Sequence, residues 1–285
     1  MRKTLRYVLC DVFTDRPLQG NALAVFTDAR AIADDPATMQ ALARELNLSE
    51  TTFVLPAQKG GHARARIFTP TVELPFAGHP TLGTAYVLSA PLQMPLIRLE
   101  LAAGIVPVRF ESAGQTASFG WMSQPLPTVA PFAEAEAALG ALGLHSSTLP
   151  IEIYDNGVRH VFIGVDSPAA LAALKPDLVA LARLDAGGFA VFAPTGSVTW
   201  DLRVFCPAEG IAEDPATGSA AGPLGLHLVR HGRAQPGAEL VFAQGARIDR
   251  PSSLFVRVEG PGARPVAIEV GGHVVSVARG EFVLP

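Results

Sequence analysis

The sequence predicts an α+β protein of two similar halves, in each of which strands lead into one buried helix. Strand patterns dominate the chain, and only a few segments have helical periodicity. Two short motifs also recur in the same order, about half a chain apart. They are RIFTP and RVFCP, followed by HPTLGTA and DPATGSA, at residues 66–70, 203–207, 79–85 and 214–220. A strand, a loop and a buried helix, built twice, would explain this recurrence.

A proline-rich segment between the two copies indicates where the lobes divide. Residues 123–132, SQPLPTVAPF, have the composition of a linker. We therefore expect an N-terminal lobe over residues 1–124 and a C-terminal lobe over residues 125–285. We also expect the lobes to close about this linker when a ligand binds.

Helices and strands alternate in the expected N-terminal lobe. Residues 34–47, DDPATMQALARELN, predict a helix, because Asp35 can cap it and Pro36 suits its first position. The apolar face of this helix comprises Met39, Leu42, Ala43 and Leu46. A second helix, buried on most sides, is expected from Pro80 to Ser89 with His79 at its cap. Strands are expected at residues 6–13, 22–26, 49–56 and 63–70 and within 94–121.

The expected C-terminal lobe has fewer helical signals. An alanine-rich segment near residues 168–174 predicts one short helix, and the DPATGSA stretch begins a buried one. Strands are expected at residues 188–195, 199–207, 238–245, 254–260 and 266–284.

The composition excludes several classes of protein. Of 285 residues, 49% are hydrophobic and 17% charged, which indicates a large core. A net charge of −4 gives no electrostatic reason to expect nucleic acid. Prolines interrupt the longest charge-free stretch, Leu74–Ile97, so we expect no membrane helix, and the lone Cys10 and Cys206 suggest a reducing, cytoplasmic location. Nucleotide-binding glycine motifs are absent from the sequence, its seven histidines are dispersed and no H-E-x-x-H motif occurs, so we expect no nucleotide and no metal.

The stretch EDPATGSAAG, residues 213–222, is almost bare of bulky side chains. A helix N-terminus presents unpaired N–H groups and a partial positive charge, and small residues leave them accessible to a carboxylate or phosphate. Ser219 would add a hydroxyl donor. Close packing of a central helix against strands explains the small residues equally well.

Three polar residues are candidates for chemistry. His79 and Asp214 occupy the same position in the two copies, and together could handle a proton or orient a substrate between the lobes. Glu50 lies where a helix passes into an apolar strand, and an inward orientation would raise the pKa of its carboxyl group. Each also has a simpler interpretation, as a helix cap or as a solvated residue at a strand start.

Several long segments resemble the phenazine-biosynthesis isomerase-like family. They are DVFTDRPLQGNALAVF, NLSETTFVLP, RIFTPTVELPFAGHPTLGTA, RVFCPAEGIAEDPATGSAAGPLG and FAQGARIDRPS, and they span nearly the whole chain. The resemblance implies the diaminopimelate-epimerase-like fold, in which each of two pseudo-symmetric lobes wraps a β-structure around a central helix. It also implies that Glu50 is the catalytic glutamate and that His79 and Asp214 are active-site residues. The substrate-binding residues would be Gly78, Thr217, Gly218 and Ser219.

The resemblance further implies a cofactor-independent isomerase that acts as a homodimer on a small carboxylic acid, with isomerisation of a dihydro-hydroxyanthranilate as the model reaction. Glu50 would take a proton from one carbon and return it to another. Two alternatives stay open. One is an epimerase or racemase of an amino-acid-like compound, although Cys10 and Cys206 are not placed for the two-thiol mechanism of the related epimerases. The other is a protein that binds a carboxylate without turnover.

Overall fold

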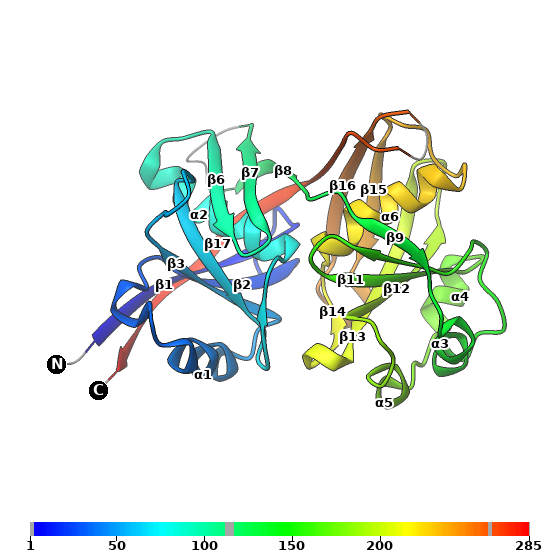
Figure 1. Cartoon of the computed structure of the whole chain (residues 1–285), viewed down its shortest axis with the longest axis horizontal. Helices are drawn as coiled ribbons and strands as arrows, with labels where there is room; N and C mark the ends of the chain where they lie inside the picture. Colours follow the sequence, from blue (N-terminus) through cyan, green and yellow to red (C-terminus); the bar gives the residue numbers. More distant parts are fainter. Residues whose placement is uncertain (1–2, 112–116, 262–263, 285) are drawn as a thin grey trace. The chain divides into compact units, whose positions relative to one another are not determined.

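The computed structural model describes residues 3–111, 117–261 and 264–284, and the chain divides into two compact units (Figure 1). Unit 1 comprises the residues up to Ser123 together with those from Gly271 onward, and unit 2 comprises Gln124–Val270. The chain therefore passes between the units twice, once in the expected linker and once within the last strand.

The elements of unit 1 are mostly strands. Its helices are α1 (Pro36–Leu46) and α2 (Gly78–Leu92), with a short 3-10 turn at Arg30–Ile32. Its strands are β1 (Lys3–Val12), β2 (Asn21–Phe26), β3 (Glu50–Leu55), β4 (Ala63–Phe68), β5 (Glu73–Leu74), β6 (Leu96–Leu101), β7 (Gly104–Phe110), β8 (Ala117–Ser123) and most of β17 (Ala267–Leu284).

The strands of unit 1 close into a ring around α2. The pairs run from β1 through β2, β3, β4, β6, β7 and β8 to β17, which pairs with β1 again. The helix α2 contacts six of these strands and has almost no polar face. A ring of strands leaves room at its axis only for a helix of small residues, and α2 begins with the sequence GHPTLGTA.

Unit 2 contains the remaining elements. Its helices are α3 (Ala135–Leu142), α4 (Pro168–Ala173), α5 (Leu178–Leu181) and α6 (Gly218–Arg230), with 3-10 turns at Pro207–Glu209 and Ala246–Ile248. Its strands are β9 (Thr128–Pro131), β10 (Glu152–Asp155), β11 (Arg159–Gly164), β12 (Gly188–Pro194), β13 (Thr199–Cys206), β14 (Ile211–Asp214), β15 (Glu239–Gln244) and β16 (Ser252–Glu259). The buried helix α6 packs on β16 and β11.

The strand pairings confirm the duplication predicted from the two motifs. In unit 1, β2 pairs in parallel with β3, β3 antiparallel with β4, and β4 in parallel with β6. In unit 2, β11, β12, β13 and β15 repeat this series in the same order and with the same directions. In both units a short hairpin strand, β5 or β14, precedes the buried helix.

The recurring arginine of the two motifs has the same structural role in each unit. Arg66 on β4 pairs with Glu73 on β5 at 2.6 Å, and Arg203 on β13 pairs with Glu213 on β14 at 2.7 Å. Each guanidinium also lies over the ring of the phenylalanine two residues later. The motif therefore fastens the hairpin that leads into the central helix, and its recurrence reflects folding rather than chemistry.

Other sequence-based expectations have mixed outcomes. Asp35 caps α1 by accepting a hydrogen bond from the Thr38 amide at 3.0 Å, as predicted, and α4 matches the expected alanine-rich helix. The expected linker contains the strand β9, and α3 and α5 were not predicted. The strand β17, which we expected to lie in the C-terminal lobe, pairs with β1 from Lys3 to Val12. This pairing explains why the end of the chain packs within unit 1.

Each unit has an apolar cluster on the outer side of its strands. In unit 1 the helix α1 covers stacked rings, among them Phe26 and Phe53 at 4.8 Å between centroids. In unit 2 the cluster lies under α3, α4 and α5 and includes Phe189 and Phe205. The strands are therefore buried on both faces, which explains their nearly continuous apolar sequences.

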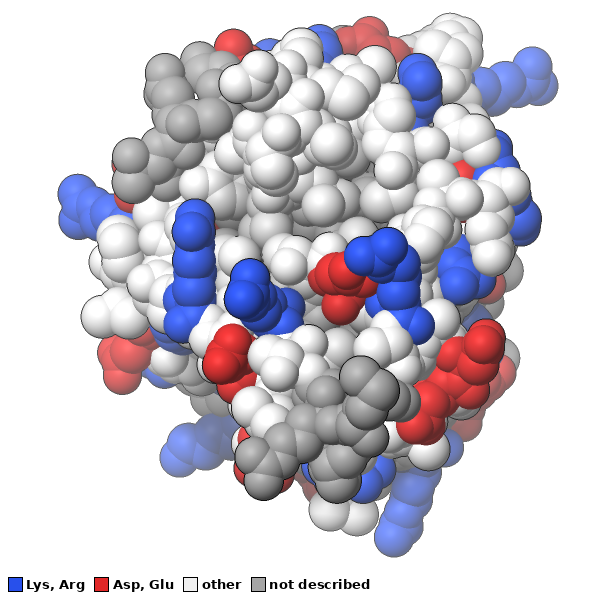
Figure 2. Space-filling view, turned by 90° about the vertical axis from the view of Figure 1, so that its left-hand side faces the viewer, with Lys and Arg blue, Asp and Glu red and all other residues white. Residues whose placement is uncertain are grey.

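Charged side chains are mixed on the face of the molecule that Figure 2 shows. Basic and acidic groups lie beside one another there, among the residues that the structure describes, and a broad area carries neither. None of the described helices is long and apolar enough to cross a membrane.

The packing of α2 predicts opposite effects for two glycine-to-alanine substitutions. A Cβ atom at Gly83 would lie 2.6 Å from Leu23 Cδ2 and 2.8 Å from Val12 Cγ2, whereas one at Gly140 in α3 would meet nothing within 4 Å. We expect Gly83→Ala to lower the free energy of unfolding by about 1–2 kcal/mol, because overpacking outweighs helix propensity. Gly140→Ala should raise it by about 0.5–1 kcal/mol. Urea unfolding measures both, and a stabilising Gly83→Ala would contradict the packing.

Candidate active site

Glu50 and His79 lie against each other in unit 1. Glu50 is the first residue of β3, His79 lies in the first turn of α2, and the Glu50 Oε2 atom is 3.4 Å from His79 Nδ1. The Nδ2 atom of Asn21, the first residue of β2, is 3.1 Å from the same ring nitrogen. Glu50 is 7% exposed and His79 2% exposed. The carboxyl group therefore points inward, and the interpretation of Glu50 as a solvated residue is wrong.

Burial keeps the imidazole of His79 neutral. Desolvation lowers its pKa from 6.5 to about 3, although a hydrogen bond with the backbone of Ala22 acts in the opposite direction. The Nε2 atom of this ring is buried and has no hydrogen-bond partner in the described part of the chain. A buried polar atom left without a partner costs about 1–3 kcal/mol, so this atom is suited to meet a ligand.

The strand pairings fix the two side chains in place. Glu50 lies opposite Leu23 in the parallel pair of β2 and β3, so it is on the strand next to β2 and near the beginning of that strand. The hydroxyl groups of Thr52 on β3 and Thr84 on α2 are 2.8 Å apart and both are fully buried. This hydrogen bond joins the strand that carries Glu50 to the helix that carries His79.

A second polar cluster occupies the start of α6 in unit 2. The Thr217 hydroxyl donates to Asp214 Oδ2 at 2.6 Å, and the Gln244 amide donates to the Asp214 carbonyl at 2.8 Å. The Thr217 backbone N–H donates in turn to Gln244 Oε1 at 3.0 Å. We expected Asp214 at the helix cap. It is instead the last residue of β14, and Thr217 is the N-cap of α6.

Three buried side chains hold the first turn of α6. Gln124 and Asn156 donate to the carbonyl groups of Gly218 and Ser219 at 2.7 and 3.0 Å. The Ser219 hydroxyl lies 3.0 Å from His160 Nε2. These bonds engage carbonyl and hydroxyl groups and not the amides at the start of the helix.

Neither central helix has a side-chain cap at its N-terminus. Ala77 precedes α2, and Thr217 precedes α6 but directs its hydroxyl to Asp214. Both helix ends therefore retain amides that suit an anion. The packing explanation for the small residues also holds further along the helices. A Cβ atom at Gly222 would lie 2.2 Å from Gln124 Oε1, and one at Gly225 would lie 2.6 Å from Val256 Cγ1.

The repeat shows that the acidic group of unit 1 has no counterpart in unit 2. In unit 1, the residue after Glu50 is Thr51, which pairs with Phe68. In unit 2, the residue after Gly188 pairs with Phe205, the counterpart of Phe68. Gly188 therefore occupies the position of Glu50. The ring of His160 fills the space beside it, 2.6 Å from where a Cβ would be. The two units are consequently similar in fold but different in chemistry.

Sequence reasoning located Glu50 and the helix starts but missed their partners. Asn21, His160 and Gln244 come from distant strands, and a polar residue at a strand end was the only signal for them.

Burial, and then the charge of Asp214, raise the pKa of the Glu209 carboxyl group to about 7. Cys10 is fully buried, and desolvation raises the pKa of its thiol, so it is not a thiolate at neutral pH.

The structure thus groups the predicted site residues by unit. Gly78, His79 and Glu50 lie together in unit 1, whereas Asp214, Thr217, Gly218 and Ser219 lie together in unit 2.

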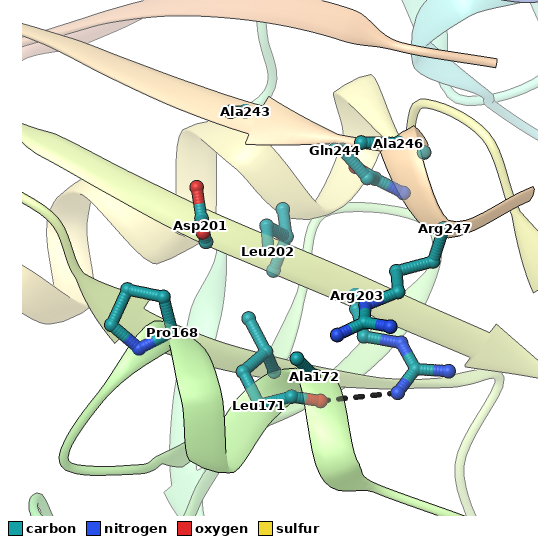
Figure 3. Close-up of a pocket in the computed structure, with 11 residues that line it drawn as sticks. Pro168, Leu171, Ala172, Asp201, Leu202, Arg203, Ala243, Gln244, Ala246 and Arg247 are labelled. Carbon is teal, nitrogen blue, oxygen red and sulfur yellow. Dashed lines mark hydrogen bonds between the residues drawn. The ribbon is translucent and has the colours of Figure 1, made fainter. Parts of the chain in front are cut away.

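A separate cavity of about 290 Å³ lies in unit 2 between α4 and the strands β13 and β15 (Figure 3). It is lined by α4, by Arg203 and by the turn that carries Arg247, and Arg203 donates to the Leu171 carbonyl at 3.1 Å. Gln244 also lines it, but none of the predicted site residues does.

The ring of strands around α2, together with the repeat of its strand series beside α6, defines the class of the protein, the diaminopimelate-epimerase-like fold. A hydroxyproline epimerase from Agrobacterium vitis, 13% identical, shares this fold with a TM-score of 0.67 over 99% of this chain and 91% of its own. The family model for phenazine biosynthesis-like proteins matches residues 10–280. The chain belongs to this family.

Two further relatives are similar over their full length. The trans-2,3-dihydro-3-hydroxyanthranilate isomerase of Pseudomonas aeruginosa is 48% identical over 98% of this chain and 99% of its own. A predicted epimerase of known structure from the same species is 37% identical, with a TM-score of 0.83 over 99% of this chain and 100% of its own. The protein is accordingly an isomerase.

The burial of His160 predicts how stability depends on pH. Desolvation lowers its pKa from 6.5 to about 4, so between these values the unfolded chain binds a proton that the folded chain does not. Stability must therefore fall as the pH falls, by about 2 kcal/mol from this group between pH 7 and pH 5. We expect His160→Gln to show a correspondingly shallower pH dependence of unfolding by urea. Parallel curves for the two proteins would contradict this prediction.

Proposed function

We propose that this isomerase moves a proton between two carbon atoms of a small cyclic carboxylic acid, with trans-2,3-dihydro-3-hydroxyanthranilate as the substrate to test first. The identity of 48% with an isomerase of that name supports the choice of compound. The observation that carries the proposal is the buried contact of Glu50 with the neutral His79, whose Nε2 atom has no partner in the described part of the chain.

Glu50 acts as the single acid/base group in this proposal. Its carboxylate takes a proton from an activated carbon, keeps it, and returns it to another carbon of the same conjugated system. His79, held neutral by burial, directs Nε2 to an amino or hydroxyl group of the substrate. Because water has little access to a side chain that is 7% exposed, the abstracted proton can be returned before it exchanges.

Unit 2 supplies its own substrate-binding groups in this proposal. The amides and hydroxyl of Gly218 and Ser219 receive the substrate carboxylate, since the start of α6 lacks a side-chain cap. Asp214, fixed through Thr217, accepts a hydrogen bond from a polar substituent of the substrate. Gly78 leaves room beside His79 at the start of α2.

Epimerisation by the pair Glu50 and His79 fits the described geometry less well. A two-base epimerase needs acid/base groups on opposite faces of one carbon, but Glu50 and His79 are 3.4 Å apart, which leaves no room for a carbon between them. The position equivalent to Glu50 in unit 2 is Gly188, so the repeat supplies no second carboxylate there.

The assembly and location of the enzyme form a further part of the proposal. Following the family resemblance, we propose a cytoplasmic homodimer that needs no added cofactor. Sedimentation equilibrium of the purified protein would show a single species of twice the chain mass.

The test of the proposed function is conversion of trans-2,3-dihydro-3-hydroxyanthranilate followed by proton NMR. We expect Glu50→Gln to lower kcat about 10³-fold, because the amide cannot take up the proton, while binding of the substrate persists. Glu45→Gln is the matched control, since Glu45 is an exposed residue of α1 only a few positions away.

Three results would overturn the proposal. A Glu50→Gln variant with the parent's rate would remove Glu50 from the chemistry. Inversion of one centre without migration of a double bond would identify an epimerase. Thermal stabilisation by the compound, without turnover by the parent protein, would indicate a binding protein.

A further inference from the structure

Two histidines and a glutamate of unit 2 converge far from the proposed active site. His227 lies in the last turn of α6 and His231 is its C-cap, while Glu152 is the first residue of β10. The Glu152 Oε2 atom is 3.2 Å from His227 Nδ1 and 3.0 Å from His231 Nε2. Neither the sequence motifs nor the proposed reaction uses these residues.

Hydrogen bonding among these groups does not by itself account for the geometry. A third group, the Tyr154 hydroxyl, donates to the same Oε2 atom at 2.9 Å and lies 3.2 Å from His227 Nδ1. Three polar neighbours thus meet at one carboxylate oxygen, which has about two lone-pair sites. A cation placed between the two rings and the carboxylate would replace both histidine contacts and leave Oε2 to accept a hydrogen bond from Tyr154.

We propose that Glu152, His227 and His231 form a binding site for one divalent transition-metal ion of the zinc type. Zinc binds imidazole nitrogen and carboxylate oxygen at about 2.0–2.2 Å, so two ligand atoms at the tetrahedral angle are about 3.3 Å apart. The two measured separations from Oε2 are close to this value, and all three ligand atoms lie within 4.8 Å of one another. Water fills the fourth position.

The surroundings prepare the ligands for a cation. The site lies at the C-terminal end of α6, where the helix dipole favours positive charge. Phe162 and Phe192 pack on the His227 ring with centroids 5.7 and 5.8 Å away and hold its orientation.

Arg230 is the one cationic side chain that contacts these ligands among the residues the structure describes. Its guanidinium lies 3.5 Å from Oε1 of Glu152, the oxygen that the metal does not use. A hydrogen bond to that atom orients the carboxylate, as outer partners of metal ligands commonly do. His231 and Arg230 are partly exposed, so the ion has a path from solvent.

The metal would act on stability rather than on catalysis. His227 and His231 lie near one end of α6, and Ser219 lies near the other, about 12–18 Å away at 1.5 Å per residue. The ion would join β10 to the end of the helix whose start binds the substrate in the proposed function. We expect no direct contribution to the proton transfer.

Cobalt(II) is the probe for this site, because tetrahedral cobalt absorbs visible light and octahedral cobalt in water absorbs weakly. Full-length protein without an affinity tag is stripped with a chelator, dialysed and titrated with Co²⁺. We expect intense visible bands that saturate at one ion per chain and disappear when Zn²⁺ is added. Zn²⁺ at a hundred times its Kd should raise Tm by about 5 °C.

His231→Ala and Glu152→Gln should each abolish the visible bands and the Tm shift. His231 is partly exposed, so its removal should leave the fold intact, and far-UV circular dichroism checks this. His145→Ala, an exposed histidine of the same unit, is the matched control and should respond as the parent does. The proposal is overturned if the parent gives neither bands nor a Tm shift, or if both variants respond like the parent.

Discussion

The enclosure of α2 within a ring of strands is the constraint on which the structure of unit 1 depends. A helix at the axis of a closed sheet has no solvent-facing side, so its residues must be small or apolar, and Gly83 packs directly against Leu23 and Val12. The same enclosure removes water from the start of the helix. It therefore determines the protonation of His79 and the inward orientation of Glu50, and the core and the chemistry have one cause.

The second unit repeats this construction without repeating the chemistry. The strand series and the arginine–glutamate pair that fastens the hairpin recur, but Gly188 stands where unit 1 has Glu50. Instead, unit 2 surrounds the start of α6 with neutral donors and acceptors such as Gln244 and His160. The duplication is therefore preserved in the fold, whereas the polar residues at the two helix starts differ.

Much of this could be predicted from local sequence. The two central helices, the Asp35 cap and the position of Glu50 at a strand start depend on short-range spacing, and the duplication was evident from two short motifs that recur along the chain. What could not be predicted depends on contacts between distant residues. Gln244 reaches Asp214 and Thr217 only because β13 and β15 pair in parallel, and β17 returns to β1 by a pairing that its alternating sequence does not specify. Local sequence predicted Asp214 as a helix cap, because the bonds that hold it in a strand come from residues distant in the sequence, such as Gln244.

The central claim of the proposed function is that burial keeps the His79 imidazole neutral at working pH, which leaves the acid/base role to Glu50. The most direct test is a ¹⁵N-histidine NMR titration of the free enzyme, with His79 assigned by comparison with His79→Gln. Because its pKa is lowered to about 3, we predict that the His79 ring signals stay at their neutral positions from pH 8 to pH 5. A titration of these signals with a midpoint inside that range would contradict the account, because the imidazole itself could then serve as the acid or base.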